Sequence, residues 1–229
     1  MYLDNVVKRA AKNIFSYPEA LDYLRGRGIT DEEIIKYSIG FTKIFGIPDD
    51  GSEDYKFLKE DSFGFKGLER RLLFPLKNIL GHTNGLVVRD IKRKVFKQYF
   101  LTEARNVGAF FGLYEALPYI SSSKKVFVHE AAIDCITFAK IFKNSVSVLT
   151  SYLNEQQYEL LSMLADKIIL VFDSDSPGRY GVQKSKETYG VSKIHSIELG
   201  YKDSNSCFKK LGSEEFFKYI KARVPIFLR

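Results

Sequence analysis

The segment KIILVFDSDSPG, residues 167–178, decides the fold of this chain, because an unbroken apolar run from Ile168 to Phe172 leads directly into an acidic loop. Such a run is typical of a strand covered on both faces of a parallel sheet. Around it, strand-like segments alternate with helical patterns, which predicts an α/β fold with a parallel sheet. We expect strands at 124–130, 145–150, 166–173 and 191–200, and helices at 132–142, 154–165, 177–190 and 213–222.

Acidic residues follow most of these expected strands. Glu130 and Asp134 come after the first strand, Asp173 and Asp175 after the third, and Asp203 after the fourth. The loops that follow parallel strands share one edge of the sheet, where ligands bind. Clustered carboxylates repel each other unless a cation neutralises them, and Mg2+ accepts a few carboxylates while keeping water molecules for substrate phosphates. The pattern therefore predicts a Mg2+ (or Mn2+) site suited to phosphoryl or nucleotidyl transfer.

Each acid also has an ordinary structural interpretation. The loop 173–176 could cap the next helix, since Asp and Ser are good caps and Pro177 suits the first helical position. Glu130 could pair with a lysine, and Asp134 could favour a helix N-terminus. Only their joint placement at one edge favours the metal site. His129 is expected to be structural, because strand alternation turns it away from the face of its neighbours.

The charge of the chain is uneven. The formal net charge is +7, and residues 59–105 contain 11 Lys or Arg against 5 Asp or Glu. A local basic excess suggests a polyanionic partner, although a basic but inert surface would give the same count. The 2 cysteines and 3 histidines cannot form the usual zinc module or a disulfide framework. We expect no zinc, a cytoplasmic location and no membrane span, because no apolar run approaches ~20 residues.

The N-terminal part combines helices with a basic hairpin. Pro18 can open one helix, and Thr30 with Glu33 forms a capping box for a second helix that has Ile34 and Ile35 as its apolar positions. Further on, RRLLFPLKN (70–78) and LVVRDI (86–91) predict two strands joined by a glycine-containing turn. Pro75 within the first of these strands indicates an edge position or a bulge.

The order of these motifs resembles a known family. EAAID (130–134) and DSDSPG (173–178) resemble the glutamate and the DxD of the Toprim module, which DnaG-type primases, type IA and II topoisomerases and several nucleases share. The flanking segments resemble successive parts of the DnaG-type primase catalytic core, so that the resemblance covers about residues 17–227. These segments are PEALDYLRGRGITDEEIIKYSIGF (18–41), RRLLFPLKNILGHTNGLVVRDI (70–91), VFKQYFLTEARNVGAFFGLYEAL (95–117) and GYKDSNSCFKKLGSEEFFKYIKARVPIF (200–227).

The resemblance implies a Toprim-type parallel sheet flanked by helices and preceded by a small basic mixed α/β subdomain. It implies a nucleotidyltransferase, a DNA-directed RNA polymerase that makes RNA primers from NTPs on a single-stranded DNA template. Glu130, Asp173 and Asp175 would be catalytic and would bind metal, with Asp134 and Asp203 as nearby ligands. The implied parts are 1–120 for template and nucleotide binding, 121–205 as the Toprim catalytic domain, and a helical segment at 206–229.

Basic residues of the hairpin region would contact nucleic acid. Arg89 and Lys97 match basic residues that face the catalytic edge in the family, and Arg89 could clamp a phosphate through two hydrogen bonds. Sequence-neutral contacts to the DNA backbone are expected from Arg70, Lys92, Arg93 and Lys94. A solvated hairpin is the alternative for the last three. Tyr99 and Phe100 could stack on bases, although burial in a core is more common for such residues.

Some positions depart from the family pattern. Ala131 and Leu149 stand where the family often has glycine, and Asn205 replaces the second acid of a KDPD-like turn. Neither the family's zinc module nor its helicase-binding domain is recognised, so we expect a replicative helicase and a separate zinc-binding module as partners, and a bacterial or phage-infected cell as the setting. The alternatives are a Toprim nuclease or topoisomerase part, and a non-catalytic replisome scaffold that binds single-stranded DNA.

Overall fold

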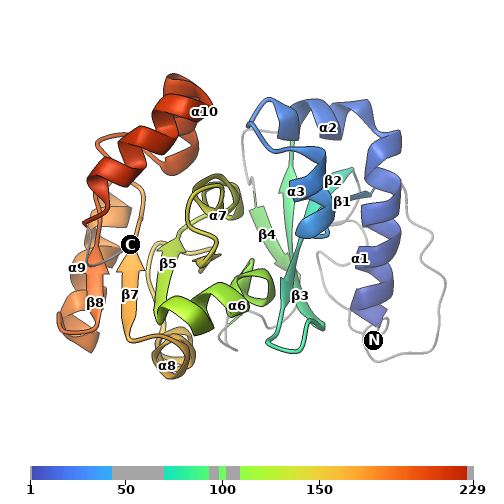
Figure 1. Cartoon of the computed structure of the whole chain (residues 1–229). Coiled ribbons are helices and arrows are strands. Elements are labelled where there is room, and N and C mark those ends of the chain that lie inside the picture. The colour runs from blue at the N-terminus through green and yellow to red at the C-terminus, as the bar shows by residue number, and fades with distance from the viewer. Residues whose placement is uncertain (1, 43–69, 93–97, 102–108, 226–229) are drawn as a thin grey trace. The chain divides into compact units, whose positions relative to one another are not determined.

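The computed structural model describes residues 2–42, 70–92, 98–101 and 109–225, drawn as coloured ribbons in Figure 1. They belong to two compact units, Met1–Ala109 and Phe110–Arg229. Residues 46–54 (GIPDDGSED), whose composition is typical of a loop, lie outside the described residues. Within the described ranges, no helix combines the length and the apolar character needed to cross a membrane. The assignment of separate roles to residues 1–120, 121–205 and 206–229 remains a prediction.

The first unit begins with helices that follow local sequence signals. They are α1 (Tyr2–Asn13), a 3-10 turn (Ile14–Ser16), α2 (Pro18–Arg25) and α3 (Asp31–Lys36). The expected capping box of α3 is confirmed, since the Glu33 N–H donates to Thr30 Oγ1 at 3.3 Å and the Thr30 N–H donates to the Glu33 carboxylate at 2.9 Å. Ile34 is buried, but Ile35 is 66% exposed. Successive helical residues point about 100° apart, so this short helix buries only one of the two.

An antiparallel sheet completes the first unit. Its strands are β1 (Gly40–Thr42), β2 (Arg71–Lys77), β3 (Thr83–Asp90) and β4 (Gln98–Leu101), in the order β1-β2-β3-β4. The expected hairpin is β2 and β3. Pro75 lies beyond Leu73, where the pairing of β2 with β1 stops, and just before an irregularity in register at Leu76/Lys77. Proline has no N–H to donate, so a position that is unpaired on the β1 side and close to a bulge suits it, as expected.

The second unit is a parallel sheet flanked by helices, which confirms the expected fold class (Figure 1). Its strands are β5 (Lys125–His129), β6 (Ser145–Ser147), β7 (Lys167–Leu170) and β8 (Ile194–Ser196), in the order β6-β5-β7-β8. The helices are α6 (Leu113–Ser123), α7 (Ala132–Ala139), α8 (Glu155–Leu164), α9 (Ser176–Tyr189) and α10 (Ser204–Arg223). β5 and β7 are central neighbours, so the loops that follow them leave the same edge side by side.

The strands of this sheet are apolar on both sides because each side has its own helical layer. Val126 and Val128 of β5 pack with residues of α6, α8 and α9, whereas Phe127 packs with residues of α7 and α10. In β7, Ile168 and Leu170 join the first of these clusters and Ile169 joins the second, because successive strand residues point to opposite faces. Rigid packing on both faces holds the strand ends in place, and with them the loops at the carboxyl edge.

Two helices of the second unit differ from the sequence-based expectation. α10 begins at Ser204 rather than 213 and bends at Gly212, whose φ is 76°. The Asp203 side chain caps this earlier start, so the glycine interrupts a helix instead of preceding one. α6 was not among the expected helices, and it contains Pro118, a residue that usually breaks helices.

Candidate active site

The loops that end β5 and β7 bring an acidic pair together. β5 and β7 are parallel and hydrogen-bonded to each other, so Glu130, which follows β5, lies beside Asp173 in the loop after β7. The backbone N–H of Asp173 donates to Oε1 of Glu130 at 3.0 Å. Both side chains are partly buried. The topology of the sheet, rather than sequence proximity, therefore joins two residues 43 positions apart.

Burial and neighbouring carboxylates raise the pKa values of this pair. The pKa of Glu130 is raised to about 7, first by burial, then by the charge of Asp173, with smaller contributions from Asp175 and Asp134. The pKa of Asp173 is raised to about 6, first by burial and then by the charges of Asp203 and Asp175. Like charges have this effect only at close range. The structure thus brings all the acids singled out in the sequence to one edge of the parallel sheet.

Asp175 and Asp203 each cap a helix at this edge. Asp175 Oδ1 accepts the Gly178 N–H at 3.0 Å at the start of α9, and Asp203 Oδ1 accepts the Ser206 N–H at 2.6 Å at the start of α10. The capping interpretation of the DSDSPG loop is therefore correct for Asp175. It does not exclude a second role, because a carboxylate offers more acceptor sites than one capping bond uses.

Asp134 is held by a buried hydrogen-bond network. Its Oδ1 accepts the backbone N–H of Asn205 at 2.8 Å, and the Asn205 side-chain amide donates to Thr137 Oγ1 at 3.1 Å. Asn205 is 1% exposed, so an aspartate at this position would place a second carboxylate in a buried site beside Asp134, at a cost in desolvation. Asparagine at 205 thus removes a ligand candidate but ties α7 to the start of α10, a role that the sequence did not reveal.

Ser174, between the two aspartates, fastens the acidic loop to the loop after β8. Its backbone N–H donates to the Lys202 carbonyl at 2.8 Å and its hydroxyl donates to the Tyr201 carbonyl at 2.7 Å. The guanidinium of Arg179 in turn donates to the Ser174 carbonyl. These bonds hold Asp173 and Asp203 on neighbouring loops, and the charge of Lys202 partly opposes the rise in the pKa of Asp173 that burial causes.

Gly178 allows the first turn of α9 to approach the acidic pair. A Cβ atom built at this position would meet the Asp173 carbonyl oxygen far inside contact distance and would lie 2.6 Å from Oε1 of Glu130. Any side chain here would displace one of these two groups. The glycine of DSDSPG is therefore part of the site, and its place in the motif is the signal that could have identified it from the sequence.

The two departures from glycine have different structural outcomes. Ala131 has φ −123° and ψ 150°, extended backbone that any residue adopts. Leu149, after β6, has φ 64°, which costs a residue with a Cβ about 1–2 kcal/mol. Its side chain is 7% exposed and its N–H donates to Ser147 Oγ at 3.2 Å. Leucine thus keeps the glycine-like backbone and gains apolar burial in return.

His129 is a core residue, as expected. It is fully buried, with its ring centroid 4.8 Å from that of Phe138 on α7. Burial lowers the pKa of His129 to about 3, so the imidazole is neutral at physiological pH. Its place next to Glu130 in the sequence gives it no access to the acidic edge.

The donor set of this edge fits a divalent cation by its chemistry. Every group is a carboxylate, the ligand type preferred by Mg2+, and the raised pKa values of Glu130 and Asp173 report burial and negative charge that a cation would offset. Among the described residues, no three or more His, Cys, Asp or Glu side chains are already arranged to hold a metal ion.

The basic candidates belong to the first unit. Arg89 lies on β3, with its guanidinium 5.6 Å from the ring centroid of Tyr23 on α2. Arg70 and Lys92 are exposed at the ends of the β2–β3 hairpin. Lys97, Arg93 and Lys94 lie outside the described residues, as do the side chains of Tyr99 and Phe100 on β4.

Comparison with known proteins places this arrangement in context. Residues 127–208 match a family model described as Toprim-like. The chain is 28% identical to the DNA primase of Lactococcus lactis over 198 residues, which cover 79% of this chain and 31% of that protein. It is 27% identical to the DNA primase of Thermotoga maritima over 237 residues, covering 93% and 41% respectively. The chain thus spans less than half the length of these curated relatives.

Solved structures show the same architecture over nearly the whole chain. The RNA polymerase domain of Mycobacterium tuberculosis primase DnaG matches with a TM-score of 0.81 at 17% identity, covering 96% of this chain and 81% of that one. A DnaG primase catalytic domain bound to single-stranded DNA matches with a TM-score of 0.76 at 20% identity, covering 98% and 80%. The chain contains a Toprim-like domain and has the fold of the DnaG catalytic core, as its motifs predicted.

Proposed function

We propose that this chain is a nucleotidyltransferase that synthesises RNA primers on single-stranded DNA. The observation that carries the proposal is the edge formed by Glu130 and Asp173, where burial and neighbouring carboxylates raise the pKa of both groups. A bound cation would offset this negative charge, and polymerisation of nucleotides requires a cation to offset charge on the attacking and leaving oxygens. The Toprim-like match over residues 127–208 and the similarity to DNA primases support the same activity.

Glu130, Asp173 and Asp175 would hold Mg2+ or Mn2+, with Asp203 beside them. When bound, the metal would activate the 3′-hydroxyl of one nucleotide and stabilise charge on the α-phosphate of the next. The protein's own task is to keep these carboxylates ionised, aligned and fixed on neighbouring loops. The 3.0 Å bond from the Asp173 N–H to Glu130 serves that task.

In the proposed reaction, the 3′-oxygen forms a bond to the α-phosphorus and the bond from that phosphorus to the bridging oxygen of pyrophosphate breaks. The hydroxyl proton must leave during this step. With a pKa of about 7, raised by burial and the charge of Asp173, Glu130 is suited to accept that proton when it is not ligating a cation. The role of general base is thus the alternative to metal ligation for Glu130.

Template and nucleotide binding are assigned to the basic residues of the first unit. Arg89, with its planar guanidinium, is suited to grip a phosphate, and Lys97 supplies a point charge. Arg70 and the 92–94 cluster would contact the backbone without reading its sequence. The solved relative with single-stranded DNA bound supports a template of this kind.

A replicative helicase and a separate zinc-binding module are the proposed protein partners, in the cytoplasm of a bacterial or phage-infected cell. This proposal rests on the family resemblance, in which a zinc module selects the start site and a helicase contact delivers the core to the fork. A partner acting in trans would raise the local concentration of template. It should therefore stimulate initiation more than elongation.

Labelled NTPs incubated with random single-stranded DNA and Mg2+ or Mn2+ test the activity. Asp173→Asn should abolish synthesis, because it removes a carboxylate charge from the acidic edge. Asp166→Asn is the matched control, since Asp166 is exposed and precedes β7 at the opposite end of the strand. Ribonucleotide oligomers that persist in Asp173→Asn would contradict the assignment of the site.

The same assay separates the alternatives. Cleaved template without oligomers would indicate a Toprim nuclease. Binding of single-stranded DNA with neither product would indicate a replisome scaffold, for which a concentration of carboxylates next to a polyanion would serve no purpose. Mn2+ and a supplied primer should be included, because elongation is expected to exceed unaided initiation.

A further inference from the structure

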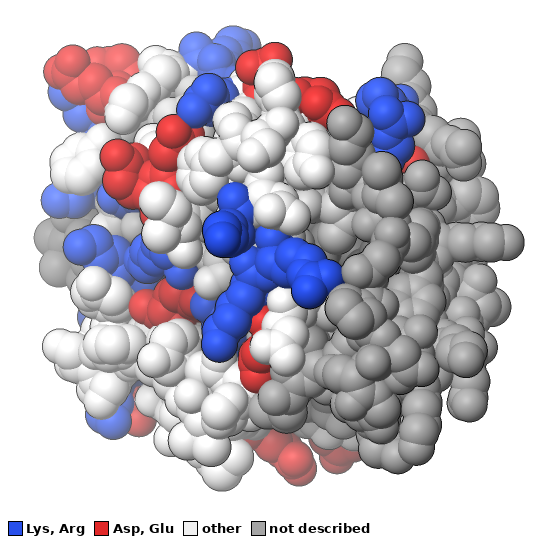
Figure 2. Space-filling model, turned by 90° about the vertical axis from the view of Figure 1, so that its right-hand side faces the viewer, with Lys and Arg blue, Asp and Glu red and all other residues white. Residues whose placement is uncertain are grey.

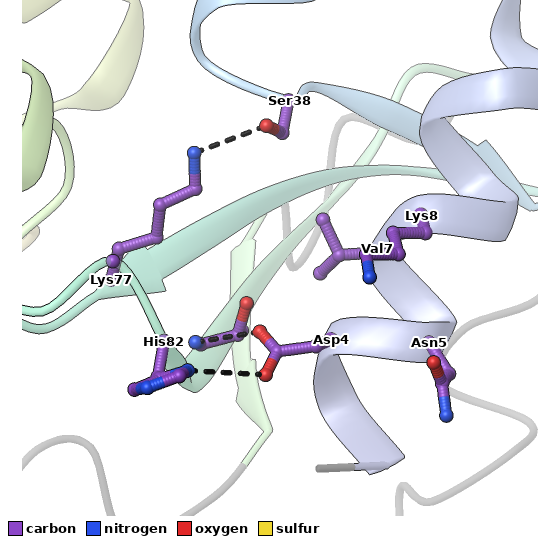
Figure 3. Close-up of a pocket in the computed structure, with 9 residues that line it drawn as sticks. Asp4, Asn5, Val7, Lys8, Ser38, Lys77 and His82 are labelled. Atoms are coloured by element: carbon purple, nitrogen blue, oxygen red, sulfur yellow. Dashed lines mark hydrogen bonds and ion pairs between the residues drawn. The ribbon is translucent and has the colours of Figure 1, made fainter.

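The first unit contains a polar pocket of about 530 Å3 that the proposed chemistry does not use (Figure 3). Helix α1, the turn that follows α3, the last residue of β2 and the β2–β3 turn form its walls. The lining residues are Asp4, Asn5, Val7, Lys8, Ser38, Lys77, Gly81, His82 and Thr83. This volume lies within the range of sites for small molecules, about 300–1,000 Å3.

Two backbone irregularities place a lysine and a hydroxyl at one side of this pocket. The register of β2 shifts between Leu76 and Lys77, and Ser38 has a left-handed φ of 52°. Together they bring Lys77 Nζ to 3.0 Å from Ser38 Oγ (Figure 3). A bulge re-aims the side chain it carries, and a left-handed serine costs free energy that a functional site can justify.

The opposite side of the pocket is organised around Asp4. The Thr83 N–H donates to Asp4 Oδ1 at 2.8 Å, and His82 Nδ1 lies 3.8 Å from Asp4 Oδ2 (Figure 3). Partial burial would raise the pKa of Asp4, but the hydrogen bonds from Thr83 and the proximity of His82 outweigh this and leave it lowered. Asn78 Oδ1 accepts the His82 N–H at 3.1 Å and fixes the turn. The one lining carboxylate is therefore already engaged by neighbours.

The surroundings of the pocket are basic. Lys8 lines it, and the exposed residues of α1 include Arg9 and Lys12. Figure 2 looks onto the side of the molecule where α1 lies and shows Lys and Arg side chains gathered near the middle of that face. A concave site lined by lysines attracts anions, and an ammonium group binds phosphate as a compact point charge.

We propose that this pocket binds the phosphate group of a small nucleotide, held by Lys77 and Lys8 with a hydrogen bond from Ser38. Its lining residues belong neither to the acidic edge nor to the basic residues assigned above to template and nucleotide binding. The proposal is thus independent of the primase activity. A failure to bind phosphate here would not contradict the primase activity, which is tested by its own assay.

Calorimetric titration of the whole chain with pyrophosphate and ATP tests this, with adenosine as the neutral comparison. EDTA should be present, because without a cation the acidic edge repels polyphosphates. Pyrophosphate and ATP should bind with a Kd below about 1 mM, and adenosine should not bind. Amide chemical shifts should change at Ser38 and Thr83. Absence of saturable binding would overturn the proposal.

Lys77→Met and Lys8→Met should each weaken binding about 10-fold, the loss typical of one charge-assisted hydrogen bond. Lys12→Met is the matched control, since Lys12 is exposed on α1 but does not line the pocket. Ser38→Gly relieves the left-handed backbone, so it should fold at least as stably as the native chain and still bind more weakly. Equal affinity in Lys77→Met and Lys12→Met would overturn the assignment.

A short single-stranded oligonucleotide distinguishes the source of the phosphate. If the natural ligand is a free nucleotide, ATP should still bind when the protein is saturated with the oligonucleotide, because the two ligands occupy different sites. Competition between them, with both affinities reduced in Lys77→Met, would assign the pocket to the backbone of a nucleic-acid strand and overturn the free-nucleotide source.

Discussion

The two sheets of this protein build polar sites in different ways. In the parallel sheet, Glu130 and Asp173 meet because all loops after the strands leave one edge. In the antiparallel sheet, successive loops leave opposite ends, so no edge collects them. There the polar pocket depends on a register shift at Leu76/Lys77 and on the left-handed backbone of Ser38.

This difference decides how each site is found. Parallel topology converts a pattern in the sequence, acids after strands, into a place in space. An irregularity in an antiparallel sheet has no such pattern, because its cause is the balance of local strain and packing. Substitutions that displace the loops of the acidic edge should therefore destabilise the fold strongly. The pocket should be affected mainly by substitutions of its own lining residues.

The largest expected effect is at the closest approach of the parallel edge. Gly178→Ala should destabilise the fold by about 3 kcal/mol, because the new Cβ would press on the Asp173 carbonyl and the Glu130 carboxylate, and backbone there has little room to yield. Gly212→Ala is the control: nothing lies within 4 Å of its Cβ, so only its left-handed φ opposes the change, at about 1 kcal/mol. Urea unfolding measures both, and equal losses would contradict tight packing at the edge.

A smaller effect is expected at Leu149, where the parallel unit has its own left-handed residue. Leu149→Ala should cost about 2 kcal/mol through loss of buried side-chain contacts. Leu149→Gly loses the same contacts but relieves the backbone, so it should be about 1 kcal/mol more stable than the alanine variant. Glycine is normally the less stable of the two. Thermal unfolding of the pair decides, and a more stable alanine variant would show that φ 64° carries no strain.

The smallest effect is the pH dependence of the acidic edge without metal. The pKa values of Glu130 and Asp173 are about 7 and 6 in the folded chain, against ordinary values of 4.5 and 3.8, chiefly through burial. The folded state therefore holds protons that the unfolded state releases, and this stability is lost as pH rises from about 4 to 7. Because both groups are partly exposed, solvent screening reduces the combined effect to about 1 kcal/mol.

Urea unfolding in EDTA between pH 5 and pH 8 measures this loss. Asp173→Asn should flatten the profile, since it removes one titrating group and the repulsion on Glu130. Mg2+ should restore stability at the alkaline end by binding the ionised carboxylates. A flat profile in the unmodified chain would mean that the acids do not interact as their arrangement implies.

The sequence by itself determined the alternation of strands and helices in the second unit, and with it the acidic edge. The spacing of apolar residues along the chain indicates which positions are buried, and a strand covered on both faces is apolar at nearly every position. It also determined local features such as the capping box at Thr30, since those bonds join residues three apart. The identity of the edge as the meeting place of Glu130 and Asp173 followed from a topological rule that holds for all parallel sheets.

Only the tertiary structure decided what depends on contacts between distant segments. It showed that Asn205 anchors Asp134, that Ser174 joins two loops and that Gly178 makes room for Glu130. It also decided that α10 begins at Ser204, capped by Asp203, and bends at Gly212. The pocket between α1 and the hairpin belongs to this group, because Asp4 and Thr83 are 79 residues apart. Such contacts are selected by packing of the whole chain, and local sequence patterns carry no record of them.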